Sequence, residues 1–271
     1  MAVISNMSYR KFEEIDNIEF FYDFKKSKEL RIIMYDFINL FDKSYLNSCI
    51  KGKDNYIVNI WRRDTLYLIK ELYNSFAAGN FYTTAVLTRV LIENYVLSHI
   101  IINNDSAGID WYFHSMIKNI HFKIPKNKRE DAERFLEEAM KEKDLKNSDF
   151  ERLNEPQKNY HWLSFLINKK DKDITFCDAC KIVDKSIYSD YEKLCDYIHP
   201  QNMAVKSSKF TFYNEFLYVL WLCIKYISSN VLLFDAIDKD ELYELSFLMD
   251  ELFLEIFKEH SPQINLNIDF I

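Results

Sequence analysis

The chain has 271 residues, with only three glycines and four prolines to interrupt regular structure. Such scarcity excludes a turn-rich sandwich or barrel. Hydrophobic residues make up 48% of the chain and aromatic residues 16%, so the sequence can build a large core and is neither disordered nor fibrous. The formal net charge of −7 argues against indiscriminate coating of nucleic acid.

Apolar residues recur at helical spacing along nearly the whole chain, without alternating segments between hairpin turns and without a fixed-period repeat. The sequence therefore predicts an all-α protein, a single multi-helix bundle of about nine or ten helices with a peripheral insertion. Two pairs, Thr175 with Asp178 and Ser189 with Glu192, are typical of helix starts. The expected helices cover 9–26, 29–48, 55–78, 81–103, 126–146, 149–168, 175–187, 189–199, 208–236 and 239–260.

The helical pattern is weakest between Asn103 and Lys128, a segment that contains Gly108 and Pro125. We expect a long loop or flexible arm there, followed by a charged, solvent-facing helix over 126–149. No composition shift separates two domains. The sequence thus predicts one all-helical domain over 1–271, with 104–150 as a peripheral insertion.

Targeting signals and cysteine usage both indicate the cytoplasm. Residues 1–16 carry charged side chains before any apolar run, which is the wrong order for a secretory signal. The longest uninterrupted apolar stretch, 216–224, has nine residues, whereas crossing a bilayer takes about 20. The five cysteines are an odd number without a regular framework, so reduced thiols are the default. We expect a cytoplasmic protein without a membrane partner.

Arg89 and Glu93 are the first candidate site residues. They fall in the segment 81–103, which is apolar almost all round and predicts a helix buried in the centre of the bundle. On a helical wheel the two side chains lie about 40° apart. Burying a guanidinium and a carboxylate is costly unless they pair or face a wet cleft. The pair is either an internal ion pair that fixes the helix register or part of a ligand-facing site.

A second candidate stretch runs from Tyr188 to Pro200. The proline disfavours helical backbone at His199, so we expect His199 at the helix end, where the helix dipole favours an imidazolium. Tyr191 and Cys195 precede it by eight and four residues, on roughly the same face. His199 is either a proton donor and acceptor near neutral pH or a helix cap.

Cysteines in the same region offer a competing chemistry. Cys177-x2-Cys180-x14-Cys195-x3-His199 supplies four soft ligands at intervals that resemble a structural zinc site. Both pairs fall inside amphipathic segments, however, where cysteines three or four residues apart usually pack in the core.

A dense basic stretch could contact nucleic acid. Three aromatic residues, Trp111, Tyr112 and Phe113, precede it, and such a combination can hold a single strand through phosphate contacts and stacking. The alternative is a solvated loop and helix start. The basic stretch consists of Lys118, His121, Lys123, Lys126, Lys128 and Arg129.

The two candidate stretches together resemble a bacterial family of all-helical proteins, over about 55–235. That family pairs an Arg-x3-Glu helix with a later Tyr-x-x-Leu-Ser-x-x-x-His-Pro helix. In outline it is similar to the HEPN superfamily (higher eukaryote and prokaryote nucleotide-binding), many of whose members are metal-independent ribonucleases of toxin and phage-defence systems. The residues that carry the likeness are Ser75 to Asn80, Ala85, Leu87, Arg89, Glu93, Trp162 and Tyr191-x-x-Leu194-Cys195-x-x-Ile198-His199-Pro200.

The chain departs from the HEPN signature, in which an arginine, four to six residues and a histidine follow one another on one helix. No arginine stands at that distance before a histidine here, and Lys193 lies six residues before His199. Lysine lacks the planar fork with which a guanidinium grips a phosphorane. If the resemblance extends to activity, Arg89 must supply the guanidinium from another helix.

The resemblance thus implies a HEPN-like defence or toxin effector of the abortive-infection type that cleaves RNA without a cofactor. Its catalytic residues would be Arg89, Glu93 and His199, and its substrate-binding residues Tyr191, Lys193 and Asn202. The candidate partners are RNA, a second copy of the chain and a regulatory protein. The alternative is a non-catalytic helical binding or regulatory module, in which the Arg89–Glu93 pair is structural and His199 caps a helix.

Overall fold

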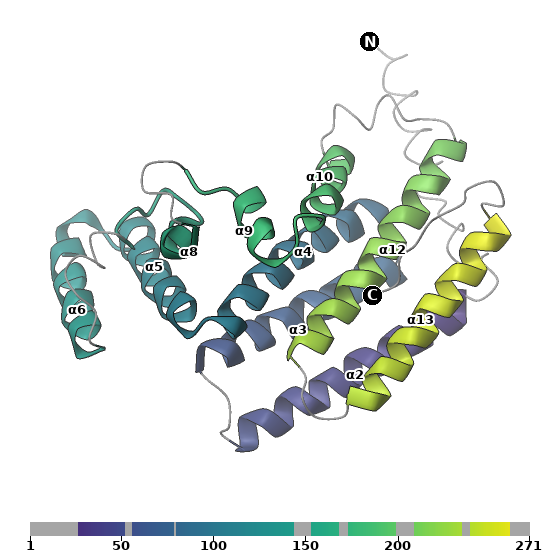
Figure 1. Cartoon of the computed structure of the whole chain (residues 1–271), viewed down its shortest axis with the longest axis horizontal. Coiled ribbons are helices and arrows are strands. Elements are labelled where there is room, and N and C mark those ends of the chain that lie inside the picture. The colour runs from purple at the N-terminus through teal and green to yellow at the C-terminus, as the bar shows by residue number, and fades with distance from the viewer. Residues whose placement is uncertain are drawn as a thin grey trace, which may run out of the picture. The chain divides into compact units, whose positions relative to one another are not determined.

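The computed structural model describes residues 27–51, 56–78, 80–143, 153–167, 173–198, 209–234 and 239–260. Within these ranges the chain is all-helical and contains no strand, as the sequence predicts (Figure 1). Two short 3₁₀ helices, η2 (Lys126–Lys128) and η3 (His161–Leu163), join the α-helices. The α-helices are α2 (Ser27–Lys51), α3 (Tyr56–Ala77), α4 (Phe81–Asn103), α5 (Asp105–Lys123), α6 (Arg129–Glu142), α8 (Ser164–Ile167), α9 (Phe176–Val183), α10 (Ile187–Ile198), α12 (Lys209–Phe234) and α13 (Lys239–His260).

Most helix positions agree with the sequence prediction. Helices α4 and α13 begin and end at the expected residues, whereas the predicted helix over 9–26 lies outside the described residues. Thr175 caps α9 as predicted, because its hydroxyl accepts from the Asp178 amide while the Asp178 carboxylate accepts from the Thr175 amide. The start predicted at Ser189 is wrong: α10 begins at Ile187, and the Asp184 carboxylate accepts from the Ser186 amide just before it.

The long loop predicted after Asn103 is a helix instead. Helix α5 occupies 105–123, and its buried residues recur every three or four positions. Asp110 and His114 occupy two of these buried positions. Polar residues at core positions remove the apolar pattern from which a helix is recognised. The expected flexible arm is therefore wrong.

The helix predicted over 149–168 is also interrupted in the described part of that segment. Residues 154–160 form turns and irregular backbone, and η3 and α8 follow them. Pro156 disfavours helical backbone at Glu155. The irregular segment is held from outside: the two ring nitrogens of His114 on α5 lie 3.0 Å from the carbonyl oxygens of Leu153 and Lys158. Such long-range bonds satisfy backbone groups that a helix would otherwise pair.

The chain forms two compact units. The first comprises 1–51, 65–91 and 194–271, and the second comprises 52–64 and 92–193. Helix α4 therefore contributes its first half to the first unit and its second half to the second unit. The prediction of a single domain stays a prediction.

The first unit is built around α2, α12 and α13. Helix α2 packs against α13, and α12 packs against α13 as well (Figure 1). Buried residues of α2 follow helical spacing through Leu30, Met34, Phe37 and Phe41, and Phe41 meets Phe234 of α12. The stripe makes one side of α2 part of the core.

A buried amide connects α12 to α4 within the first unit. The Asn230 side chain is fully buried and donates to the carbonyl oxygen of Leu91, at 3.2 Å, and to that of Tyr226, at 2.7 Å. A buried amide is tolerated because its donors are satisfied. Asn230 therefore adds a directional contact to an otherwise apolar helix interface.

The second unit is built around α5. Helix α6 lies beside α5, and η3 packs against α5 too (Figure 1). Trp111 of α5 meets Trp61 of α3, with ring centroids 5.0 Å apart. Ile57 packs close to α5 at Gly108, where a Cβ atom would lie 3.7 Å from the Ile57 side chain, at ordinary van der Waals contact. This packing orders the segment that the sequence predicted as a loop.

Among the residues that the structure describes, two helices are long and apolar enough to cross a membrane by length and composition. They are Tyr82–Asn103 in α4 and Leu217–Phe234 in α12. The α12 stretch is 67% buried, as expected of a core helix, whereas the α4 stretch is 44% buried and exposes Val90. The even burial predicted for α4 is therefore wrong at Val90. Core helices of soluble proteins pass the same test, so these spans are weak evidence.

Candidate functional site

The two candidate stretches are connected by a hydrogen bond. The Tyr191 hydroxyl on α10 donates to Oε1 of Glu93 on α4, at 2.8 Å, across a sequence separation of 98 residues. Both residues belong to the second unit. Hydrogen bonds to a carboxylate are stronger than those between neutral groups, and this one is partly buried. The bond fixes the Glu93 side chain against α10.

Aromatic packing sets the direction of the Tyr191 hydroxyl. The Tyr191 ring lies 4.4 Å, centroid to centroid, from the ring of Phe176, which begins α9 and is buried. One turn earlier on α10, the Tyr188 ring stacks on the Tyr191 ring at 6.1 Å. Tilted and offset aromatic pairs are the favourable arrangements. With the ring held on two sides, the hydroxyl is positioned for Glu93 rather than left to rotate.

A buried thiol, that of Cys180, lies one turn after Phe176 on α9. Burial raises the pKa of Cys180 to about 12, and the nearby Cys177, Glu93 and Asp184 act in the same direction. A thiol with such a pKa stays protonated at neutral pH and is a poor nucleophile. Cys180 therefore contributes to packing rather than acting as a nucleophile.

The remaining predicted site residues differ in what can be said of them. Arg89 is half-buried and lies one helical turn before Glu93 on α4, and Lys193 is exposed on α10. His199 and Asn202 lie outside the described residues. The structure thus brings together Glu93 and Tyr191, and the catalytic and substrate-binding roles predicted for all six site residues stay predictions.

The zinc hypothesis concerns Cys177, Cys180, Cys195 and His199. Cys180 is buried, Cys177 and Cys195 are half-buried, and all three are free thiols. Within the part of the chain that the structure describes, no three His, Cys, Asp or Glu side chains are grouped to hold a metal ion. Since His199 is outside that part, the four-ligand site stays a prediction.

An exposed basic corner terminates α5. We give this name to Phe122, Lys123, Lys126 and Lys128, all of which are exposed. The Phe122 side chain is 60% exposed, and the ring of His121 packs edge-on against it at 4.8 Å. Cationic side chains beside an exposed ring can contact phosphates and stack on a base.

The basic corner differs from the predicted basic stretch. Of the three aromatic residues expected to stack, Phe113 is buried, Tyr112 packs on Phe113 and Trp111 packs on Trp61, whereas Phe122 is exposed. Two of the predicted cations make structural contacts: Lys118 Nζ donates to Oδ1 of Asn159, and Arg129 Nε donates to the Ile124 carbonyl oxygen. The position of Phe122 inside the basic run was the signal that could have identified it.

Comparison with known proteins places the chain in a family. Residues 55–211 match a protein family described as a family of unknown function, DUF5677. The match covers more than half of the chain and includes Arg89, Glu93, Tyr191 and His199. The protein therefore belongs to the DUF5677 family. No curated protein and no solved structure matches the chain.

Proposed function

We propose that this protein is a HEPN-like effector of bacterial defence or toxin systems that cleaves RNA without a metal ion. The observation that carries the proposal is the hydrogen bond from Tyr191 to Glu93, because it joins the Arg-x3-Glu helix to the helix that leads to His199. A catalytic constellation assembled from two helices requires such a connection between them.

The proposed reaction is an intramolecular transesterification at one phosphodiester of the RNA strand. His199 takes the proton of a 2′-hydroxyl, or delivers a proton to the leaving 5′-oxygen. The 2′-oxygen bonds to the adjacent phosphorus while the bond to the 5′-oxygen breaks, which leaves a 2′,3′-cyclic phosphate and a 5′-hydroxyl. Arg89 stabilises the phosphorane oxygens.

Glu93 and Tyr191 act as positioning residues in this scheme. The Glu93 carboxylate orients Arg89 or His199, and Tyr191 fixes the carboxylate through the 2.8 Å bond. A guanidinium or an imidazolium held by a carboxylate keeps its direction and its charge. Lys193 and Asn202 bind the substrate.

The basic corner supports RNA as the substrate. Its three lysines can neutralise phosphates locally even though the protein as a whole carries a charge of −7. Phe122 can stack on an unpaired base, which favours single-stranded RNA over a duplex.

The second candidate function is a non-catalytic helical binding or regulatory module. The same hydrogen bond favours it, because a partly buried phenol–carboxylate bond can serve only to fix the packing of two helices. In that case Arg89 is a structural residue and His199 caps α10.

A cleavage assay separates the two functions. Purified protein incubated with total RNA and a chelator should cleave the RNA and leave 2′,3′-cyclic phosphate ends. His199→Ala should abolish cleavage without lowering the midpoint of thermal unfolding. The matched control is His99→Ala, which removes an imidazole from α4 outside the proposed site and should retain cleavage. Undiminished cleavage by His199→Ala would eliminate the mechanism, and no cleavage by the wild-type chain would favour the binding module.

A further inference from the structure

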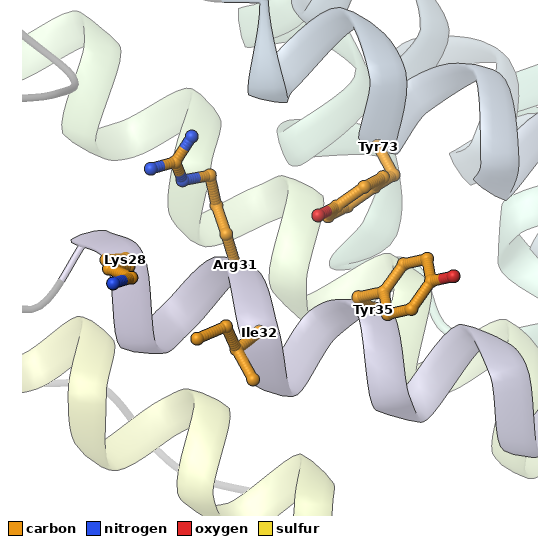
Figure 2. Close-up of a pocket in the computed structure, with 5 residues that line it drawn as sticks. All are labelled: Lys28, Arg31, Ile32, Tyr35 and Tyr73. Carbon is orange, nitrogen blue, oxygen red and sulfur yellow. The ribbon is translucent and has the colours of Figure 1, made fainter.

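A cavity in the first unit lies outside the region described so far. It has a volume of about 380 Å³ and lies between α2 and α3, lined by Lys28, Arg31, Ile32, Tyr35 and Tyr73 (Figure 2). This volume lies within the range of small-molecule sites, about 300–1,000 Å³. Because Ile32 and Tyr35 are half-exposed, the cavity is open to solvent.

Four of the lining residues form a second face of α2. Lys28, Arg31, Ile32 and Tyr35 follow the spacing i, i+3, i+4, i+7, which places them on one side of a helix. The core stripe of α2, with Leu30 and Met34, points elsewhere and is fully buried. The side chains of Ile32 and Tyr35 are 50% and 52% exposed. This face combines two cations, an aliphatic side chain and an aromatic ring outside the core stripe.

The aromatic part of the cavity comes from both helices. The rings of Tyr35 on α2 and Tyr73 on α3 lie 6.0 Å apart, tilted by 43°. Their separation leaves no room for a third ring between them, so a ligand ring would stack on the open side of Tyr35, beside Ile32. Stacking on an aromatic side chain is a common way to hold a base in nucleic-acid complexes.

The cationic part of the cavity comes from Lys28 and Arg31 on α2. In Figure 2 the Tyr73 hydroxyl points toward the side on which Arg31 rises from α2, whereas Tyr35 turns its hydroxyl away. Burial raises the pKa of Tyr73, and the charge of Arg31 opposes that shift while Tyr35 and Asp36 add to it. The Arg31 guanidinium and the Tyr73 hydroxyl therefore share one electrostatic environment. Lys28 adds a second cation, and Asp36 offsets part of the positive charge.

We propose that this cavity binds one nucleotide unit, with its base on Tyr35 and Ile32 and its phosphate between Lys28 and Arg31. A guanidinium recognises phosphate oxygens with a planar fork, and the Tyr73 hydroxyl can donate to the same group. Two cations beside one carboxylate match a single phosphate better than a triphosphate. The nucleotide unit can be a free nucleoside monophosphate or part of an RNA strand.

The proposed site is independent of the proposed ribonuclease function. Four of its five residues precede residue 55, where the match to the DUF5677 family begins. Its residues also share nothing with Arg89, Glu93, Tyr191 and His199. Binding can therefore be tested without any cleavage activity, and failure of one proposal leaves the other intact.

Calorimetric titration of the full chain with AMP and GMP tests the proposal. At least one of them should bind, and adenosine or inorganic phosphate alone should bind about tenfold more weakly or worse, because each lacks half of the contacts. A pentaribonucleotide without a terminal phosphate distinguishes the two sources. If it binds as tightly as AMP or GMP, the occupant is an RNA segment; if only the mononucleotide binds, the occupant is the free nucleotide.

Variants assign the binding to the cavity. Arg31→Gln and Tyr35→Ala should each weaken binding by about tenfold or more. The matched controls are Arg63→Gln and Tyr67→Ala, two exposed positions on α3 that do not line the cavity. Thermal unfolding of each variant verifies folding, and Tyr73→Phe, which removes one hydroxyl, serves if Arg31→Gln unfolds. Absence of binding up to about 1 mM of either nucleotide and of the pentamer overturns the proposal. So does binding that the cavity variants leave unchanged.

Discussion

Nε2 of His114 lies 3.0 Å from the carbonyl oxygen of Lys158, 44 residues later in the chain. Nδ1 of the same ring lies 3.0 Å from the carbonyl oxygen of Leu153. A neutral imidazole has one N–H and can donate to only one of these oxygens, whereas an imidazolium donates to both. Burial nevertheless lowers the pKa of His114, and the nearby Lys118 and His161 act in the same direction. The ring is therefore held between two acceptors in a setting that disfavours its charge.

His114→Leu should lower the free energy of unfolding by about 2 kcal/mol at neutral pH, because the ring then leaves buried carbonyl oxygens without a donor. Since the folded pKa lies below the unfolded value of 6.5, the wild-type contribution is complete above 6.5 and is lost as the pH falls from there through the folded pKa. Urea unfolding at about pH 7.5 and about pH 5.5 should therefore show a smaller pH effect in the variant. His121→Ala is the control; an equal pH effect in wild type and His114→Leu would contradict the prediction.

Asp250 has the opposite pH dependence. Burial within α13 raises the pKa of its carboxyl from 3.8 to about 6. The folded state thus binds this proton more tightly than the unfolded chain, and the associated stability is lost as the pH rises through about 6. Between about pH 8 and pH 5 the wild type should gain about 1 kcal/mol relative to Asp250→Asn, a value reduced for partial exposure. Glu251→Gln, an exposed neighbour, should show no such difference by urea unfolding; a parallel pH profile for Asp250→Asn would refute the assignment.

Tyr191→Phe should separate the structural from the catalytic role of the hydroxyl. Loss of the bond to Glu93 should cost about 1–2 kcal/mol of unfolding free energy, since the acceptor is a carboxylate and the ring packing is kept. RNA cleavage should fall as well if the proposed mechanism holds. Tyr243→Phe, at an exposed position on α13, should change neither quantity. Wild-type stability in Tyr191→Phe would show that the bond contributes nothing.

Replacing Lys123, Lys126 and Lys128 of the basic corner by glutamine should weaken binding of a single-stranded RNA at low salt. Three lost phosphate contacts should reduce the slope of log affinity against log salt by about 2. Phe122→Ala should weaken binding with the slope unchanged, because stacking releases no counterion. Fluorescence anisotropy measures both effects. The charge-matched control replaces the exposed Lys141, Lys143 and Lys185, and an equal effect of that control would remove the basic corner as the binding surface.

Purified protein from zinc-supplemented cells should contain less than about a tenth of an equivalent of zinc after dialysis. The reason is the absence of a group of three possible ligands among the described residues. Atomic emission spectroscopy measures the zinc content of the purified protein. About one equivalent of zinc, lost on combining Cys177→Ser with Cys180→Ser, would instead establish the structural zinc site.

Helices with a regular apolar pattern were predictable from the sequence. Helices α4 and α13 agree with the predicted bounds at both ends, and Thr175 with Asp178 marks the start of α9. Helix α5 was missed because Asp110 and His114 occupy core positions, which breaks the pattern although the backbone is helical. Tertiary contacts, such as those of His114, decide the local structure there.

The candidate site was predictable only in part. The sequence indicated that Glu93 and Tyr191 belong to related stretches, but their hydrogen bond depends on how α9 and α10 pack against α4. The cavity beside α2 could not be predicted, because Arg31 and Tyr35 resemble an ordinary solvated helix face until Tyr73 of α3 is placed opposite them. Spacing along one helix says nothing of the neighbour that completes a site.

The contact of Asn230 with the Leu91 carbonyl oxygen has a consequence for how this protein can change over time. Aliphatic side chains in the same interface attract one another in many relative positions of the two helices, whereas the amide reaches the Leu91 carbonyl oxygen in one. Drift among Leu, Ile and Val around it can therefore repack the interior without displacing α12 along α4. The register of α12 on α4 therefore does not depend on which aliphatic residues pack between the two helices.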